Sequence, residues 1–311
     1  MNEIIIHKGA EVQVYTPLTD NLYIRFVSYL DAKPKTIETY TRALRQLFAY
    51  FAAAGRTKPH RDDVIAYRES LKQAHKPTTV QNYITAARLF FQWTAQEGIY
   101  PNIAEHIKGA KLDREHKKDY LNAGQVKAVI KAVDRSTLQG KRDYAALVLM
   151  VTGGLRTIEV SRANIGDLRA AGANTVLYIQ GKGKDEKADY VKISEPVEKA
   201  IRAYLKARKE ADQGAPLFAS LSNNNKGQRM TTRAISGLVK AHLTEAGYNS
   251  DRLTAHSLRH TAVTLSLLAG KSLEEVQEFA RHANITTTQI YNHALDRAKN
   301  SCSEAVASAI F

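Results

Sequence analysis

The chain has 311 residues, of which 45 are Lys or Arg, 31 are Asp or Glu, and one, Cys302, is a cysteine. This length predicts about two domains, since single cores seldom grow far beyond ~200 residues. The lone cysteine excludes an internal disulfide and any cysteine-cluster zinc or iron–sulfur site. Apolar runs such as residues 144–151 are too short to span a bilayer, so we expect a cytoplasmic protein that does not enter the membrane.

The net charge of +14 indicates a polyanionic partner, with nucleic acid as the first candidate. Residues 1–110 carry 14 basic and 10 acidic side chains, and residues 111–311 carry 31 and 21. The surplus is therefore shared along the chain. If the partner is DNA, we expect both parts of the chain to contact it.

Residues 17–98 have the pattern of a small helical domain. Apolar residues recur every three or four positions in two segments, which predicts a buried face on each of two helices. Shorter helices are expected over residues 22–30 and 62–74, and four helices of this length make a small bundle. The apolar positions are Ile37, Tyr40, Leu44, Leu47, Phe48 and Phe51 in the first segment and Val80, Tyr83, Ile84, Ala87, Phe90 and Phe91 in the second.

Prolines and glycines mark the expected ends of the two long helices. Pro34 and Pro77 stand where helix starts tolerate proline, and Gly55 and Gly98 stand where helices stop. The segment GAKLDREHKKDY is dense in charge and has no periodicity, which is typical of a linker. We therefore divide the chain into an N-terminal extension (1–16), a helical domain (17–108), a linker (109–120) and a larger domain (121–311).

The larger domain combines helices with two predicted strands. Helices are expected over residues 125–133 and 143–152, and helical patterns resume after the strands. TVLYIQ (175–180) and ADYVKI (188–193) read as strands joined by the turn GKGKDEK. The predicted fold class is mainly α with a small antiparallel β-sheet, an α+β arrangement.

Several common catalytic motifs are absent from the sequence. It has neither a G-x-x-x-x-G-K-[ST] phosphate loop nor a G-x-S-x-G elbow, which argues against nucleotide and ester hydrolysis. His256 and His260 are spaced for a metal site on a helix, but Ser257 stands where an acidic residue is expected. We expect no metal and no cofactor.

Three short segments carry side chains that could take part in catalysis. Each of these side chains could also have a purely structural role. Arg156 follows Gly-Gly-Leu at the end of an apolar helix, and with Glu159 it could form a simple helical ion pair. His256 opens the segment HSLRH and could merely cap the next helix. Tyr291 lies nine residues after His282 and, taken alone, could be a half-buried aromatic.

The order of these segments is more specific than any one of them. Gly-Leu-Arg-x-x-Glu, a hairpin around Gly-Lys-Gly, His-x-Leu-Arg-His, and Thr-Thr-x-x-Tyr following a histidine together resemble the tyrosine recombinase, or phage integrase, family. KTIETYTRALRQLFAYF and TTVQNYITAARLFFQW resemble the SAM-like core-binding domain of Xer-type members. The resemblance covers about residues 17–311 and implies a DNA-binding domain followed by a catalytic domain.

The resemblance also implies roles for individual residues. Tyr291 is similar to the nucleophile, which forms a covalent 3′-phosphotyrosyl bond, and strand exchange then proceeds through a Holliday junction. Arginines would neutralise the phosphorane, and a lysine in the hairpin turn would act as general acid. The implied catalytic set is Arg156, Lys182, His256, Arg259, His282 and Tyr291, with Glu159 in support.

One position departs from the family pattern. Relatives usually have glycine before the last histidine, where this chain has Arg281. The arginine either alters the turn that presents His282 or adds a phosphate contact.

Two other functions stay open beside recombination, namely a non-enzymatic DNA-binding protein with the same fold and a DNA-relaxing enzyme like a type IB topoisomerase.

We expect the helical domain to bind DNA and the C-terminal tail to bind protein. Polar side chains outside the two apolar stripes could contact double-stranded DNA at a specific core site, or could simply be solvated. The segment SEAVASAIF reads as a short amphipathic helix, which either folds back on its own domain or, as the resemblance implies, docks on a neighbour within a homo-tetramer. The candidate DNA contacts are Thr36, Thr39, Arg42, Arg45, Thr78, Gln81, Asn82 and Arg88.

Overall fold

The computed structural model describes residues 4–8, 11–15, 21–111, 119–181, 183–299 and 302–311. The chain divides into two compact units, Met1–Arg114 and Glu115–Phe311. This division falls within the predicted linker, most of which lies outside the described residues, so its role as a linker stays a prediction. Within the described part of the chain, every helix is too short or too polar to cross a membrane.

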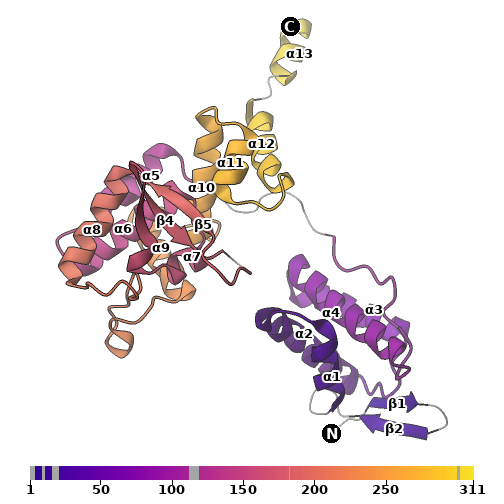
Figure 1. The fold of residues 1–311 in the computed structure, drawn as a ribbon. Helices are drawn as coiled ribbons and strands as arrows, with labels where there is room; N and C mark the ends of the chain where they lie inside the picture. The colour runs from indigo at the N-terminus through magenta and orange to yellow at the C-terminus, as the bar shows by residue number, and fades with distance from the viewer. Residues whose placement is uncertain (1–3, 9–10, 16–20, 112–118, 182, 300–301) are drawn as a thin grey trace. The chain divides into compact units, whose positions relative to one another are not determined.

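The first unit is a helical bundle preceded by a β-hairpin (Figure 1). Strands β1 and β2 pair antiparallel inside residues 1–16, where no strand or helix is predicted from the sequence. The four helices confirm the predicted ones within a few residues at each end. The elements are β1 (Ile4–Lys8), β2 (Glu11–Tyr15), α1 (Asn21–Leu30), α2 (Pro34–Ala53), α3 (Arg61–Ala74) and α4 (Pro77–Gln96).

The two longest helices form where the apolar stripes predict them. Each begins with a proline, whose fixed φ suits the first helical position, and each is followed within two residues by a glycine at φ +65°. Most stripe residues are buried, although Ile37, Tyr40 and Tyr83 are only partly covered. Burying one large apolar side chain contributes about 1.5–3 kcal/mol. The core of this unit is aromatic, with rings of Phe26 and Phe90 crossing edge to face at 5.3 Å.

The second unit contains helices around a small antiparallel sheet, which confirms the predicted fold class. Strands β4 and β5 are the predicted pair, and β3, which is not predicted, pairs with β4 to give the order β3-β4-β5. The elements are α5 (Ala123–Ala132), α6 (Leu138–Gly153), α7 (Thr157–Arg162), the short 3-10 helix η1 (Ile165–Asp167), β3 (Leu168–Ala171), β4 (Asn174–Ile179), β5 (Asp189–Ile193), α8 (Glu195–Arg208), the short 3-10 helix η2 (Asn223–Asn225), α9 (Thr232–Glu245), α10 (Ala255–Leu268), α11 (Leu273–Ala280), α12 (Thr286–Lys299) and α13 (Cys302–Ile310).

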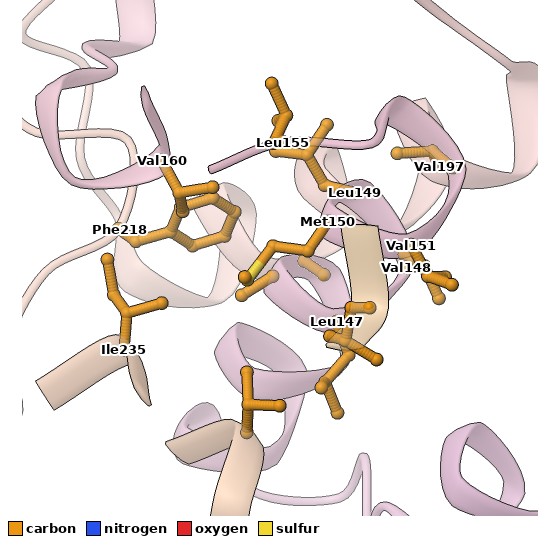
Figure 2. Packing of buried hydrophobic residues seen from close by; sticks show 14 of the residues in the cluster. Leu147, Val148, Leu149, Met150, Val151, Leu155, Val160, Val197, Phe218 and Ile235 are labelled. Carbon is orange, nitrogen blue, oxygen red and sulfur yellow. The ribbon is translucent and has the colours of Figure 1, made fainter. Parts of the chain in front are cut away.

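The second half of helix α6, residues 145–151, runs through the core of this unit and is apolar around its whole circumference. Figure 2 shows Met150 on the side of Phe218, whereas Val148 and Val151 lie on the side of Val197 from α8. A helix that is apolar all round requires neighbours on every side. The core therefore fixes the end of α6, and with it the turn that carries Arg156.

The C-terminal helix α13 is exposed. Its apolar side chains Val306, Ile310 and Phe311 are 57%, 69% and 104% exposed, respectively. These apolar side chains are largely exposed within the described chain, and both interpretations of the tail, folding back on its own domain or docking on a neighbour, stay predictions.

Candidate active site

Arg156 stands at the turn between α6 and α7. The C-terminal cap of α6 is Gly154 at φ +57°, in the left-handed region that favours glycine. Nη1 of Arg156 donates to Oε1 of Glu159 at 2.9 Å, and the backbone N–H of Arg156 donates to Oε2 at 2.8 Å. The Arg156 side chain is 29% exposed and that of Glu159 is fully buried. The predicted ion pair is therefore present, with a partly solvent-accessible guanidinium held by a buried carboxylate.

Arg259 is the most buried cation of the site, at 1% exposure. Its Nη1 donates to the carbonyl of Gly154 at 2.6 Å, and its Nη2 donates to the carbonyl of Ala280. Burial lowers the pKa of Arg259 to about 9, and the positive charges of Arg156 and Arg281 act in the same direction. An anion bound here would relieve the repulsion between these like charges. The cluster is thus suited to a phosphate.

Tyr291 lies on α12 and packs in a small apolar cluster with Val263 and Val276. It is 6% exposed, which is more buried than the half-buried aromatic that the isolated residue predicts. Burial raises the pKa of Tyr291 to about 12, while the positive charges of Arg259 and Arg156 oppose this rise. The phenol therefore lies within electrostatic reach of both arginines.

His282 is held beside Tyr291 by a short side chain on the same helix as the tyrosine. Nδ1 of His282 lies 2.9 Å from Oγ1 of Thr288, at hydrogen-bond distance. The ring of His282 is nearly parallel to that of Tyr291, at 16°, with ring centres 6.3 Å apart. The turn before α12 therefore brings His282 to the tyrosine.

His256 and His260 lie one helical turn apart on α10. Their rings meet edge to face at 4.4 Å, and the ring of His260 lies 5.1 Å from that of Tyr291. The N-cap of α10 is Thr254, whose backbone N–H donates to Oγ of Ser257 at 3.0 Å. The reading in which His256 caps this helix is therefore wrong, because the cap position lies two residues earlier.

The hairpin between β4 and β5 faces this cluster. Lys182, the predicted general acid, lies outside the described residues. Lys184 in the same turn forms an ion pair with Asp189 at 2.8 Å. A hollow of about 650 Å³ is lined by Lys184 together with Arg156 and His282. The turn that carries the predicted lysine thus borders the same space as two other predicted site residues.

Three further residues of the cluster make contacts that the sequence does not predict. His260 and Thr288 stand inside recognised motifs, but nothing in the sequence indicates that they contact Tyr291 and His282. Arg281 stands where relatives usually have glycine. Its side chain is 12% exposed and pairs with Glu159 at 3.2 Å, a contact that sequence spacing does not reveal.

The candidate DNA-contacting residues lie on α2 and α4 of the first unit. Thr39 and Gln81 are partly buried, and Nη2 of Arg42 donates to Glu38 at 3.1 Å. Exposure fits both DNA contact and simple solvation, so these assignments stay predictions. The exposed members are Thr36, Arg42, Arg45, Thr78, Asn82 and Arg88.

Comparison with protein families decides the class. Residues 119–298 match the phage integrase family, and residues 23–98 match the phage integrase N-terminal SAM-like domain. The chain belongs to the phage integrase family. It is a tyrosine recombinase, an enzyme that breaks and rejoins DNA in site-specific recombination.

Individual tyrosine recombinases match along most of their length. The recombinase is 32% identical to XerC of Pelobacter propionicus over 272 residues, which cover 85% of this chain and 86% of that protein. It is 26% identical to a tyrosine recombinase of Synechococcus elongatus over 315 residues, 96% of each chain. It is 28% identical to XerD of Listeria monocytogenes, covering 83% of this chain and 87% of that one.

Solved structures share the fold at lower identity. XerH bound to a palindromic difH substrate in a post-cleavage complex matches with a TM-score of 0.70 at 21% identity, over 91% of this chain and 84% of that one. A lambda integrase fragment, a dimer bound to a COC′ core site, matches with a TM-score of 0.66 at 15% identity, over 86% and 95%. These likenesses establish that the recombinase has the fold of this family.

Proposed function

We propose that the recombinase cleaves DNA by attack of the Tyr291 phenol on a backbone phosphate, which forms a covalent 3′-phosphotyrosyl intermediate. Strand exchange then passes through a Holliday junction during integration, excision or resolution at a specific core site. The observation that carries the proposal is the position of the Tyr291 ring, 5.1 Å from that of His260 and 6.3 Å from that of His282, in the field of Arg259 and Arg156. A tyrosine beside two guanidiniums fits a nucleophile that meets a phosphodiester.

The cleavage step exchanges one phosphodiester for another. The bond from Oη of Tyr291 to phosphorus forms while the bond from phosphorus to O5′ breaks. The phenolic proton passes to a base, and O5′ takes up a proton and leaves as a hydroxyl group. Because the energy of the broken ester is retained in the phosphotyrosyl ester, a 5′-hydroxyl can reverse the step and rejoin a strand.

The two arginines neutralise the charge that develops on the phosphorane. Arg156 has a partly exposed guanidinium, and Arg259 is fixed by two carbonyl acceptors. A guanidinium carries five N–H donors, so an arginine can keep its protein acceptors and still donate to a non-bridging oxygen, which a lysine cannot reproduce. Glu159 orients Arg156 through their 2.9 Å ion pair. By comparison with oxyanion donors, loss of either arginine slows cleavage by about 10²-fold or more.

Proton transfer is assigned to the remaining members of the set. His282 and His256 serve as hydrogen-bonding or proton-transferring groups, with His282 already oriented by Thr288. Lys182 protonates the leaving O5′, an assignment that depends on the family resemblance. The structure supports this assignment to the extent that Gly181 and Lys184, from the same turn, line the hollow that Arg156 and His282 also line.

The substrate is double-stranded DNA, bound by both units of the chain. The family assignment and the charge of +14 support this, and solved relatives with the same fold are bound to their own DNA sites. Residues on α2 and α4 are proposed to contact phosphates or base edges, and we place this activity in the cytoplasm. The proposed contacts are Thr36, Thr39, Arg42, Arg45, Thr78, Gln81, Asn82 and Arg88.

Four protomers are proposed to assemble on two duplexes through their C-terminal tails. Support comes from α13, in which Val306, Ile310 and Phe311 expose apolar surface that a groove on a neighbouring protomer would cover.

The proposal is tested with a nicked duplex whose sequence is first selected from a random library by binding to the recombinase. The wild-type chain is expected to form a covalent adduct, whereas Tyr291→Phe is expected to bind the duplex equally well without forming one. Tyr190→Phe serves as the control, because Tyr190 lies on β5 and is 60% exposed. Adduct formation by Tyr291→Phe would exclude this nucleophile. Relaxation of supercoiled DNA lacking the selected site would instead support the topoisomerase-like alternative.

A further inference from the structure

Arg281 adopts a backbone conformation that favours glycine. It caps α11 with φ +53° and ψ +47°, in the left-handed region. The Cβ atom makes this conformation less favourable for arginine than for glycine. Contacts of the Arg281 side chain must therefore offset the backbone cost.

The side chain folds inward onto the end of α6. Nη1 of Arg281 donates to the carbonyl of Phe279 at 2.7 Å, and Nη2 donates to the carbonyl of Gly154 at 3.1 Å. Nη2 also donates to Oε2 of Glu159 at 3.2 Å. With 12% of its side chain exposed, Arg281 directs its guanidinium to protein groups rather than to solvent.

These contacts connect Arg281 to both arginines of the proposed site. Oε1 of Glu159 accepts a hydrogen bond from Arg156, and Oε2 accepts one from Arg281. Two cations therefore hold one fully buried carboxylate. The Gly154 carbonyl accepts from both Arg281 and Arg259. Nη2 of Arg156 lies 3.4 Å from the backbone carbonyl of Arg281, a long contact. Arg281 therefore touches the partners of the catalytic guanidiniums.

We propose that Arg281 is a positioning residue, which fixes the Glu159 carboxylate so that Glu159 orients Arg156. This inference rests on the proposed function. Without Arg281, the buried Glu159 carboxylate keeps the Arg156 guanidinium at Oε1 but loses the Arg281 guanidinium at Oε2. Small displacements of charged groups around a reacting phosphate slow the reaction strongly.

The test compares single-turnover cleavage of the selected nicked duplex by the full chain and its variants. Arg281→Gly removes the side chain and also relieves the backbone, so slower cleavage cannot be attributed to strain. We expect a loss of about 10- to 100-fold in cleavage rate with unchanged DNA affinity. Lys209→Gly is the matched control, because Lys209 caps α8 at φ +58°, is exposed and carries the same charge. It is expected to cleave like the wild type.

A double-variant cycle with Glu159→Gln separates positioning from a general loss of structure. If Arg281 acts through Glu159, Arg281→Gly lowers cleavage by less than about threefold in the Glu159→Gln background. Equal losses in both backgrounds, wild-type cleavage by Arg281→Gly, or weakened DNA binding would overturn the inference. Arg281→Asn gives the same comparison if the glycine variant does not fold, since asparagine tolerates this conformation. Adduct formation by Tyr291→Phe would instead count against the proposed function itself.

Discussion

The guanidinium of Arg259 donates to the carbonyl of Gly154 at 2.6 Å, a contact between residues 105 positions apart that joins α10 to the turn carrying Arg156. The same guanidinium reaches the carbonyl of Ala280 at the end of α11. One buried side chain thus ties three segments together. An arginine proposed for catalysis also holds the site in place.

Arg259→Lys is expected to impair both cleavage and stability. A lysine cannot span two carbonyls as a planar guanidinium does, so the cleavage rate should fall by about 10²-fold or more. One buried carbonyl would lose its partner, at a cost of about 1–3 kcal/mol in the free energy of unfolding. Single-turnover cleavage and urea unfolding measure the two effects. Arg202→Lys, on the exposed face of α8, should change neither, and wild-type cleavage by Arg259→Lys would refute the assignment.

Gly154→Ala is expected to disturb the turn before Arg156. A Cβ atom at Gly154 would lie 3.1 Å from the ring of Phe279, in addition to the strain of φ +57°. Gly172→Ala is a matched control, because Gly172 has φ +59° and nothing within 4 Å of its added Cβ. Strain alone should lower the free energy of unfolding by about 1–2 kcal/mol in both variants.

We expect Gly154→Ala to lose more stability than Gly172→Ala, and to be the variant of the two that also cleaves more slowly. Urea unfolding and cleavage of the selected duplex provide the comparison. Equal destabilisation with unimpaired cleavage in both variants would show that the turn tolerates displacement.

His242 is expected to make stability depend on pH. Its Nε2 lies 3.2 Å from Oδ2 of Asp143, and this hydrogen bond raises the pKa of His242 above 6.5 despite its burial, with a smaller contribution from Glu245. A raised folded-state pKa means that the stabilisation is complete below the unfolded value of about 6.5. It is lost as the pH rises through the folded-state pKa.

The melting-temperature difference between the wild type and His242→Gln should therefore be largest below about pH 6.5 and should shrink as the pH rises above that value. Glu245→Gln should retain most of this pH dependence, because Glu245 is the lesser partner and its side chain is 62% exposed. A difference that stays constant as the pH rises would contradict the assignment.

Much of the fold follows from local patterns. Leu44 and Phe51 on α2 are buried because their spacing places them on one face of a helix, and prolines and glycines mark its ends. Strand β3 is missed because its four residues lie largely exposed and show no alternation of apolar and polar side chains. The hairpin β1-β2 is missed too, although EVQVY alternates as a strand does.

The sequence predicts which residues belong to the site but does not predict how they contact one another. Motif spacing identifies Arg156 and Tyr291, but it does not reveal which side chains meet around them. The pairing of Arg281 with Glu159 spans 122 positions, and the contact of His242 with Asp143 spans 99. Such pairs depend on how helices pack, which no local pattern specifies.

The residue that bears the covalent bond to DNA is the most direct test of this mechanism. The wild-type recombinase is incubated with the selected nicked duplex in the presence of a metal chelator and without nucleotide, and the digested adduct is analysed by mass spectrometry. Residues 282–297 form a tryptic peptide whose one tyrosine is Tyr291. We predict that this peptide carries the 3′-phosphonucleotide on Tyr291. An adduct on any other residue, or one that forms only with added metal or nucleotide, would contradict the mechanism.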